Sequence, residues 1–69
     1  MSLTQLINHG KLSEIEPYIR KRFPDTNDVV INILVCVIFY LRTLPEEFRT
    51  KGSLIVELNY LKLNKEFDD

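Results

Sequence analysis

The sequence has very little of the residues that small proteins use as cross-links. Cys36 is the single cysteine among 69 residues, which excludes a disulfide within the chain. His9 is the single histidine and lies far from Cys36, so no CxxC or HxxxH spacing for a structural zinc is present. Because Cys36 lies in the most apolar stretch, we expect its thiol to be buried as a small hydrophobic group. The sequence predicts no bound metal and no other cofactor.

Catalytic motifs are also lacking. There is no GxSxG motif and no glycine-rich phosphate loop, because the two glycines are isolated. His9 directly precedes a glycine at a predicted helix end, where a histidine commonly interacts with the last carbonyl groups. Two pairs of acidic residues lie in predicted first helical turns, where the helix dipole favours carboxylates: Glu14 with Glu16, and Glu46 with Glu47. We therefore predict that the protein is not an enzyme.

No excess of charge of either sign is present. Nine basic and ten acidic residues are mixed along the chain and give a formal net charge of −1. Such a balance gives no bulk attraction to nucleic acid or to an anionic membrane. The N-terminus lacks the basic region and apolar run of a signal peptide, which predicts a cytoplasmic protein.

What the sequence does have is apolar residues, 45% of the total, arranged between helix-capping and turn signals. A chain this short buries only about 60% of the surface that its unfolded form exposes, so it depends on dense packing or on association. Ser2 and Gln5 have the spacing of a capping box, which predicts a helix over residues 2–9. Gly10 is expected to close this helix in a left-handed conformation.

A second helix is predicted over roughly residues 13–23. Ser13 and Glu16 again have capping-box spacing. Pro17 is acceptable only in the first turn of a helix, so we expect the regular helix to start nearer Glu16. Pro24 then stops it.

The most informative segment is residues 29–41, which read VVINILVCVIFYL. The many β-branched residues suit a strand, but thirteen or more residues are long for a strand and ordinary for a helix. A helix of this length reaches about 20 Å, short of the roughly 30 Å hydrocarbon core of a membrane. A dense turn signal over 24–28 supplies the helix start. We therefore predict a buried helix rather than a strand or a membrane span.

The C-terminal part of the chain predicts two further helices. Residues 44–51 begin with Pro45 and two acids, which is typical of a helix start, and Gly52 marks a stop before the chain restarts. Over residues 53–67, leucines recur at i, i+4 and i+7: Leu54, Leu58 and Leu61. Partial alternation leaves a strand open for residues 54–64, but the longer period favours a helix. From about residue 65 we expect a frayed acidic tail.

Together these segments predict an all-α fold. We expect one helical domain over residues 1–69, a small bundle of four to five short helices around a central apolar helix, residues 28–43. A helix that is apolar on all sides must be covered on all sides. So few short helices are not enough to cover all sides of the central helix, and we therefore expect the bundle to be oligomeric.

The least apolar stripe of the central helix is expected to face outward. Its residues follow at spacings of 4, 4, 3 and 4: Asp28, Asn32, Cys36, Phe39 and Thr43. An exposed apolar strip usually marks an interaction surface. Asn32 either fixes the register across such an interface or is a core asparagine bonded to backbone or water. The predicted partner-binding residues are Asn32, Val35, Cys36, Phe39, Tyr40 and Tyr60.

These features predict a small protein-interaction module, an adaptor, chaperone or inhibitor that binds another protein, as a homodimer. One alternative is a dimeric DNA-binding regulator that contacts phosphates through Arg20, Lys21 and Arg22. A helix C-terminus attracts such residues in any case, and the apolar helix that follows is unsuited to reading bases. A second alternative is a small membrane-active protein built on the central apolar segment.

Overall fold

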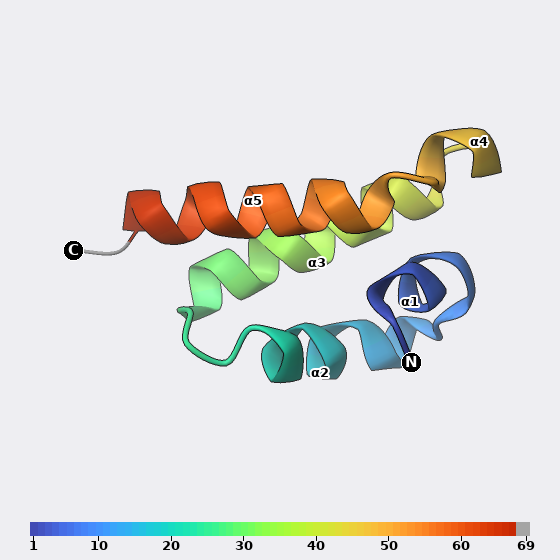
Figure 1. Ribbon diagram of the computed structural model, residues 1–69. Helices are drawn as coiled ribbons and strands as arrows, with labels where there is room; N and C mark the ends of the chain where they lie inside the picture. Colours follow the sequence, from blue (N-terminus) through green and yellow to red (C-terminus); the bar gives the residue numbers. More distant parts are fainter. Residues whose placement is uncertain (68–69) are drawn as a thin grey trace.

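The computed structural model describes residues 1–67, and the regular structure among them is entirely helical (Figure 1). Four of its five helices have seven residues or more. The prediction of an all-α chain is confirmed, including helices in the two segments for which the sequence left a strand open. The helices are α1 Leu3–His9, α2 Leu12–Arg22, α3 Asp28–Arg42, α4 Glu46–Arg49 and α5 Gly52–Phe67.

The start of α1 follows the sequence prediction, but its end does not. The N–H of Gln5 donates to Oγ of Ser2 at 3.2 Å, and the N–H of Ser2 donates to Oε1 of Gln5 at 2.9 Å, which completes the capping box. Gly10 has φ −65° and ψ 147°, so the predicted left-handed conformation is wrong. Glycine is needed here for close approach, because a Cβ at Gly10 would lie 2.6 Å from the carbonyl oxygen of Leu6.

Helix α2 begins earlier than the sequence predicts. Its first residue is Leu12, and the N–H of Lys11 donates to Oε1 of Glu14 at 2.9 Å. Pro17 therefore lies inside the helix rather than in its first turn, and the carbonyl of Ser13 has no N–H to accept from at that position. The predicted capping pair of Ser13 and Glu16 is wrong. The helix starts before Ser13, and it is the carboxylate of Glu14 that accepts the backbone N–H of the capping residue, Lys11.

Helix α3 is the centre of the packing. Asn27 caps it by accepting the N–H of Val30 at 3.0 Å, and the helix contacts each of the other four. Its observed bounds, Asp28–Arg42, agree with the predicted central helix to within a residue. Five of its side chains are buried in the core: Val30, Ile31, Leu34, Ile38 and Leu41.

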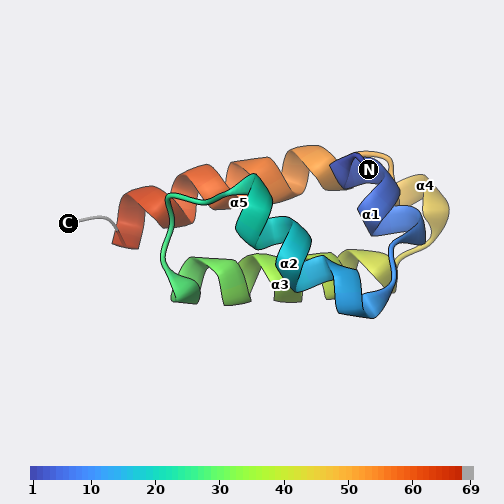
Figure 2. The ribbon, with the colours of Figure 1, turned by 90° about the horizontal axis from the view of Figure 1, so that it is seen from below.

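The core lies between α3 and the two N-terminal helices, with α5 along one side (Figures 1 and 2). Helices α3 and α5 lie side by side and run in opposite directions, and α2 packs on α3. The molecule is elongated, with principal extents of 37, 21 and 16 Å. Since a helix with its side chains is about 10 Å across, 16 Å leaves room for two layers and not for a ring of helices around α3.

Candidate interaction surfaces

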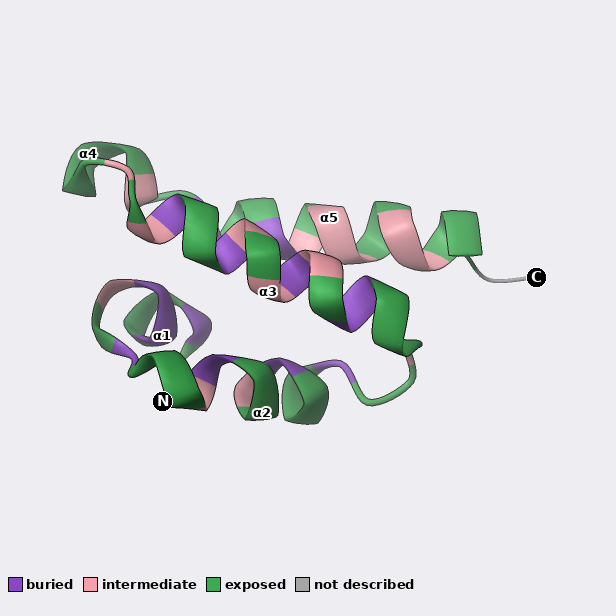
Figure 3. Cartoon of the chain, turned by 180° about the vertical axis from the view of Figure 1, so that it is seen from behind, coloured by how far each residue is buried: buried purple, intermediate pink, exposed green. Residues whose placement is uncertain are grey.

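The outer side of α3 carries an exposed, uncharged stripe, which we call the α3 stripe and define as Val29, Asn32, Cys36, Phe39 and Tyr40. Exposed bands recur along this side of the helix (Figure 3). Tyr40 is 65% exposed, Val29 52% and Phe39 41%, which is unusual for large apolar side chains on a central helix. Asp28 and Thr43 are exposed at its two ends, so the outward orientation expected from the spacing is observed.

The positions of two stripe residues settle structural questions that the sequence left open. Asn32 is exposed, so it is not a buried core asparagine. Cys36 is exposed as well, and the expectation of a buried thiol is wrong, because the thiol lies on a side of α3 that no helix within residues 1–67 covers. Val35 lies at the edge of the stripe and packs partly against the core.

The ends of α3 are tied to the N-terminal helices. Asp28 accepts a hydrogen bond from Nη1 of Arg20 at 2.7 Å, and Nη1 of Arg42 donates to the carbonyl of Leu6 at 3.0 Å. Between these two ends no residue of α3 is charged. Two hydrogen bonds raise the pKa of Arg20 above its already high ordinary value; the one to Asp28 has the larger effect and the one to Glu16 the smaller. Arg20 therefore keeps its charge over the whole working pH range.

Tyr60 lies apart from the α3 stripe. Its ring stacks on the ring of Phe23, with centroids 4.3 Å apart and 26° between the planes. The guanidinium carbon of Arg22 lies 4.9 Å from the Phe23 centroid. Tyr60 is half-buried and packs against the core, so it attaches α5 to the end of α2.

The basic cluster at the end of α2 is largely engaged within the chain. Arg20 bonds to Asp28 and also to Glu16, at 3.3 Å, and Arg22 forms an ion pair with Glu57 of α5. Within residues 1–67, Lys21 is the member of the cluster without an ion-pair partner. Two of the three positive charges are thus already balanced by carboxylates, which weakens a phosphate-binding role.

Helix α5 carries a second exposed surface that the sequence reading did not assign as a site. The side chains of Leu54, Leu58 and Leu61, here called the leucine seam, are 55–61% exposed. The side of α5 that packs on the core carries Val56, Tyr60 and Leu63 instead. The leucine period in the sequence indicated an apolar side of this helix. It did not show that this side is exposed, because Val56, Tyr60 and Leu63 have the same spacing.

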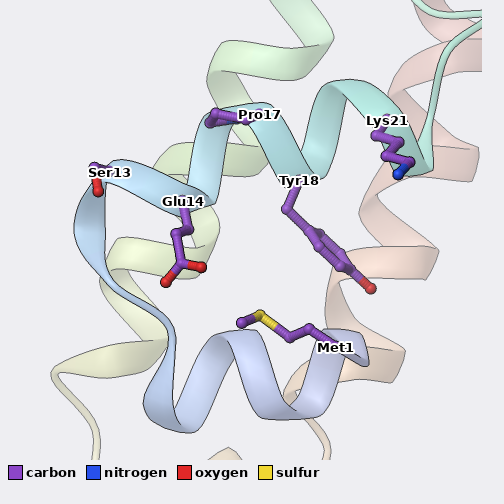
Figure 4. Close-up of a pocket in the computed structure, with 6 residues that line it drawn as sticks. All are labelled: Met1, Ser13, Glu14, Pro17, Tyr18 and Lys21. Carbon is purple, nitrogen blue, oxygen red and sulfur yellow. The ribbon is translucent and has the colours of Figure 1, made fainter.

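An open pocket of about 320 Å³ lies between the N-terminal residue and α2 (Figure 4). The side chain of Met1 lies across from those of Glu14 and Tyr18. None of its lining residues is buried: Met1, Ser13, Glu14, Pro17, Tyr18 and Lys21. The pocket is therefore a shallow hollow at the surface, unlike the enclosed clefts that bury most of a bound small molecule.

Metal-binding groups and membrane-spanning helices are both absent from residues 1–67. Within the part of the chain that the structure describes, no group of three or more potential metal-binding residues lies together. None of the helices in residues 1–67 has both the length and the apolar character required to cross a membrane. Comparison of the chain with protein-family models, with curated proteins and with solved structures finds no match in any of the three.

Proposed function

We propose that this protein is a small, non-enzymatic interaction module and that the α3 stripe pairs with the same stripe of a second copy. The observation that carries the proposal is the exposure of Phe39 and Tyr40 on a helix side that has no charge between Val29 and Leu41. Exposed aromatic side chains in an uncharged setting are characteristic of the centre of a protein–protein interface.

A second copy fits this stripe because pairing introduces no like-charge contact. An antiparallel arrangement places the N-terminal end of one α3, which carries Asp28, beside the C-terminal end of the other, which carries Arg42. It also sets the two helix dipoles in opposite directions, which is favourable. The bulky end of each stripe, with Phe39 and Tyr40, then faces the smaller end of its partner, with Val29 and Asn32.

Asn32 has a specific role in this arrangement. A polar side chain on an apolar helix face favours the register in which its amide finds a hydrogen-bond partner. Cys36 lies near the middle of the stripe, so the two Cys36 thiols of a dimer come close to the two-fold axis.

The dimer is expected to be of moderate affinity. A helix of fifteen residues is about 22 Å long, so the stripe covers far less than the roughly 800 Å² per partner of a standard interface. We therefore expect association in the micromolar range rather than the nanomolar range.

Sedimentation equilibrium of the full chain tests the proposal. The wild type should show a reversible monomer–dimer equilibrium, and Phe39→Glu should shift it by at least tenfold toward monomer, because it buries a charge at the interface. Phe48→Glu is the matched control, since Phe48 is 61% exposed but lies on α4. A short bifunctional maleimide should also join two wild-type chains through Cys36.

Two outcomes would overturn the proposal. One is a wild type that stays monomeric up to roughly 100 μM, a concentration at which micromolar association is largely complete. The other is equal behaviour of the Phe39→Glu and Phe48→Glu variants. The DNA-binding and membrane-active alternatives stay predictions, and no contact within the described chain favours either of them.

A further inference from the structure

The leucine seam of α5 belongs to a regular pattern of five residues. Lys51, Leu54, Leu58, Leu61 and Lys65 follow one another at spacings of 3, 4, 3 and 4. This is the a/d spacing of a coiled-coil seam, three leucines with a lysine at each end. All five side chains are exposed.

The seam is not needed to hold α5 in place. At about 100° per residue, its leucines lie roughly 160° around the helix from Val56, Tyr60 and Leu63, which face the core. On the flank of α5 that faces the end of α2 and the loop after it, Glu57 pairs with Arg22, and Asn64 accepts a hydrogen bond from Thr26 at 2.9 Å. The helix is therefore attached along one side and presents the leucines on the other.

The charges around the seam are predominantly positive. Lys51 and Lys65 lie at its ends, and Lys62 lies one turn after Leu58, on the flank away from Glu57. None of the three lysines has an ion-pair partner within residues 1–67. The carboxylate of Glu57 is engaged by Arg22. Glu66 lies about a quarter of a turn around the helix from Lys65 and one turn after Lys62, so it is the one further carboxylate of the described part of α5 near these lysines.

A second copy of this chain is a poor occupant for the seam. In a parallel pair that matches all three leucines, Lys51 faces Lys51 and Lys65 faces Lys65. In the antiparallel pair with the same overlap, Lys51 faces Lys65 at both ends. Like charges that face each other across a helix pair are unfavourable, so these lysines disfavour a second copy as the partner of the seam.

We propose that the leucine seam binds an amphipathic helix of another protein that carries leucines at the same spacing and glutamate or aspartate at both ends. Such a helix inserts its apolar side chains between Leu54, Leu58 and Leu61 and places its carboxylates beside Lys51, Lys62 and Lys65. The inference extends the proposed function, on whose general idea of protein binding it rests, to a different helix and a different class of partner.

Fluorescence anisotropy with two labelled peptides tests this inference. Both are helical and carry three leucines at spacings of 4 and 3; one has glutamates around them, and the other has lysines at the same positions. The full-length protein should bind the glutamate peptide at least about tenfold more tightly than the lysine peptide. Lys62→Glu/Lys65→Glu should reverse this preference.

Single substitutions separate the seam from other exposed leucines. Leu58→Asp should weaken binding of the glutamate peptide at least about tenfold, whereas Leu12→Asp, at a leucine of similar exposure on α2, should leave it unchanged. Circular dichroism checks that both variants stay folded, as expected for exposed positions. Phe39→Glu should bind the peptide like the wild type, so failure of the α3 dimer leaves this test intact.

Three results would overturn the inference. The first is equal affinity for the two peptides. The second is an unchanged preference after charge reversal at Lys62 and Lys65. The third is self-association of the wild type that Leu58→Asp abolishes, which would show that a second copy covers the seam.

Discussion

The two longest helices, α3 and α5, lie side by side and yet use their residues in opposite ways. Helix α3 has fifteen residues and buries five large side chains, whereas α5 has sixteen and buries only Gly52 and Val56. Both expose apolar side chains, but the α3 stripe is uncharged and the leucine seam is bordered by lysines. Helix α3 thus supplies most of its apolar side chains to the core, whereas α5 packs on the core along one side and leaves its leucines exposed.

Truncation of one large apolar residue on each helix should give the largest contrast. Ile38→Ala on α3 removes a fully buried side chain and should cost about 2–5 kcal/mol of unfolding free energy. Leu58→Ala on α5 removes an exposed one and should change it by about 0.5 kcal/mol or less. Urea denaturation followed by circular dichroism measures both. Similar losses would mean that α5 is as much part of the core as α3.

The contact between α5 and its neighbours can be tested at Gly52, the first residue of α5. A Cβ there would lie 3.1 Å from Cδ1 of Ile7 and 3.4 Å from Cδ1 of Leu41, so even a methyl group fits tightly and a larger side chain must displace these neighbours. Gly52→Val should cost about 1–3 kcal/mol through overpacking. Gly52→Ala is the control and should cost less, because the better helix propensity of alanine offsets the crowding by up to about 1 kcal/mol. Equal unfolding free energies for wild type and Gly52→Val would contradict the tight packing.

Tyr40 of α3 and Tyr60 of α5 sharpen the comparison, because Tyr40 is exposed and Tyr60 packs against the core. Tyr60→Leu should lose the stacking on Phe23 and cost about 0.5–1.5 kcal/mol of stability beyond any change in buried area. Tyr40→Leu should leave the stability of the dilute monomer nearly unchanged, because this ring is 65% exposed. Thermal unfolding at low protein concentration measures both, and an equal loss for the two variants would contradict the assignment of Tyr60 to the inner side of α5.

The ion pair between Arg22 and Glu57 should give the smallest effect. Both side chains are more than a third exposed, so Glu57→Gln should cost at most about 1 kcal/mol. The difference from the wild type should shrink as salt is raised from low concentration to about 1 M, where screening is strong. A loss that salt does not reduce would point to packing rather than charge as the contribution of Glu57.

Much of the local structure was predictable from sequence because short-range interactions determine it. The capping box of Ser2 and Gln5, the turn before α3 and the length of the apolar run all act within a few residues. Capping failed as a guide at α2, where Glu14 competed with Glu16 for the role and only the folded chain shows which prevailed. The outward orientation of Asn32 and Phe39 was also predictable, because the least apolar side of a helix is the least costly to leave exposed. For Cys36 two expectations conflicted, since it lies on that side and yet in the most apolar segment, and only the folded chain shows that it is exposed.

The leucine period by itself favoured a helix for α5, but only the tertiary structure excluded the strand left open for residues 54–64 and decided which side of the helix is buried. Two sets of residues share the spacing of 4 and 3: Leu54, Leu58 and Leu61, and Val56, Tyr60 and Leu63. Periodicity does not distinguish between them, and the leucines are the more strongly apolar set. The neighbouring elements select the second set, because Tyr60 meets the ring of Phe23 and the flank beside it meets Arg22 and Thr26. Those partners lie more than thirty residues away in the chain, and this is why the leucine seam becomes visible as a surface only in the folded molecule.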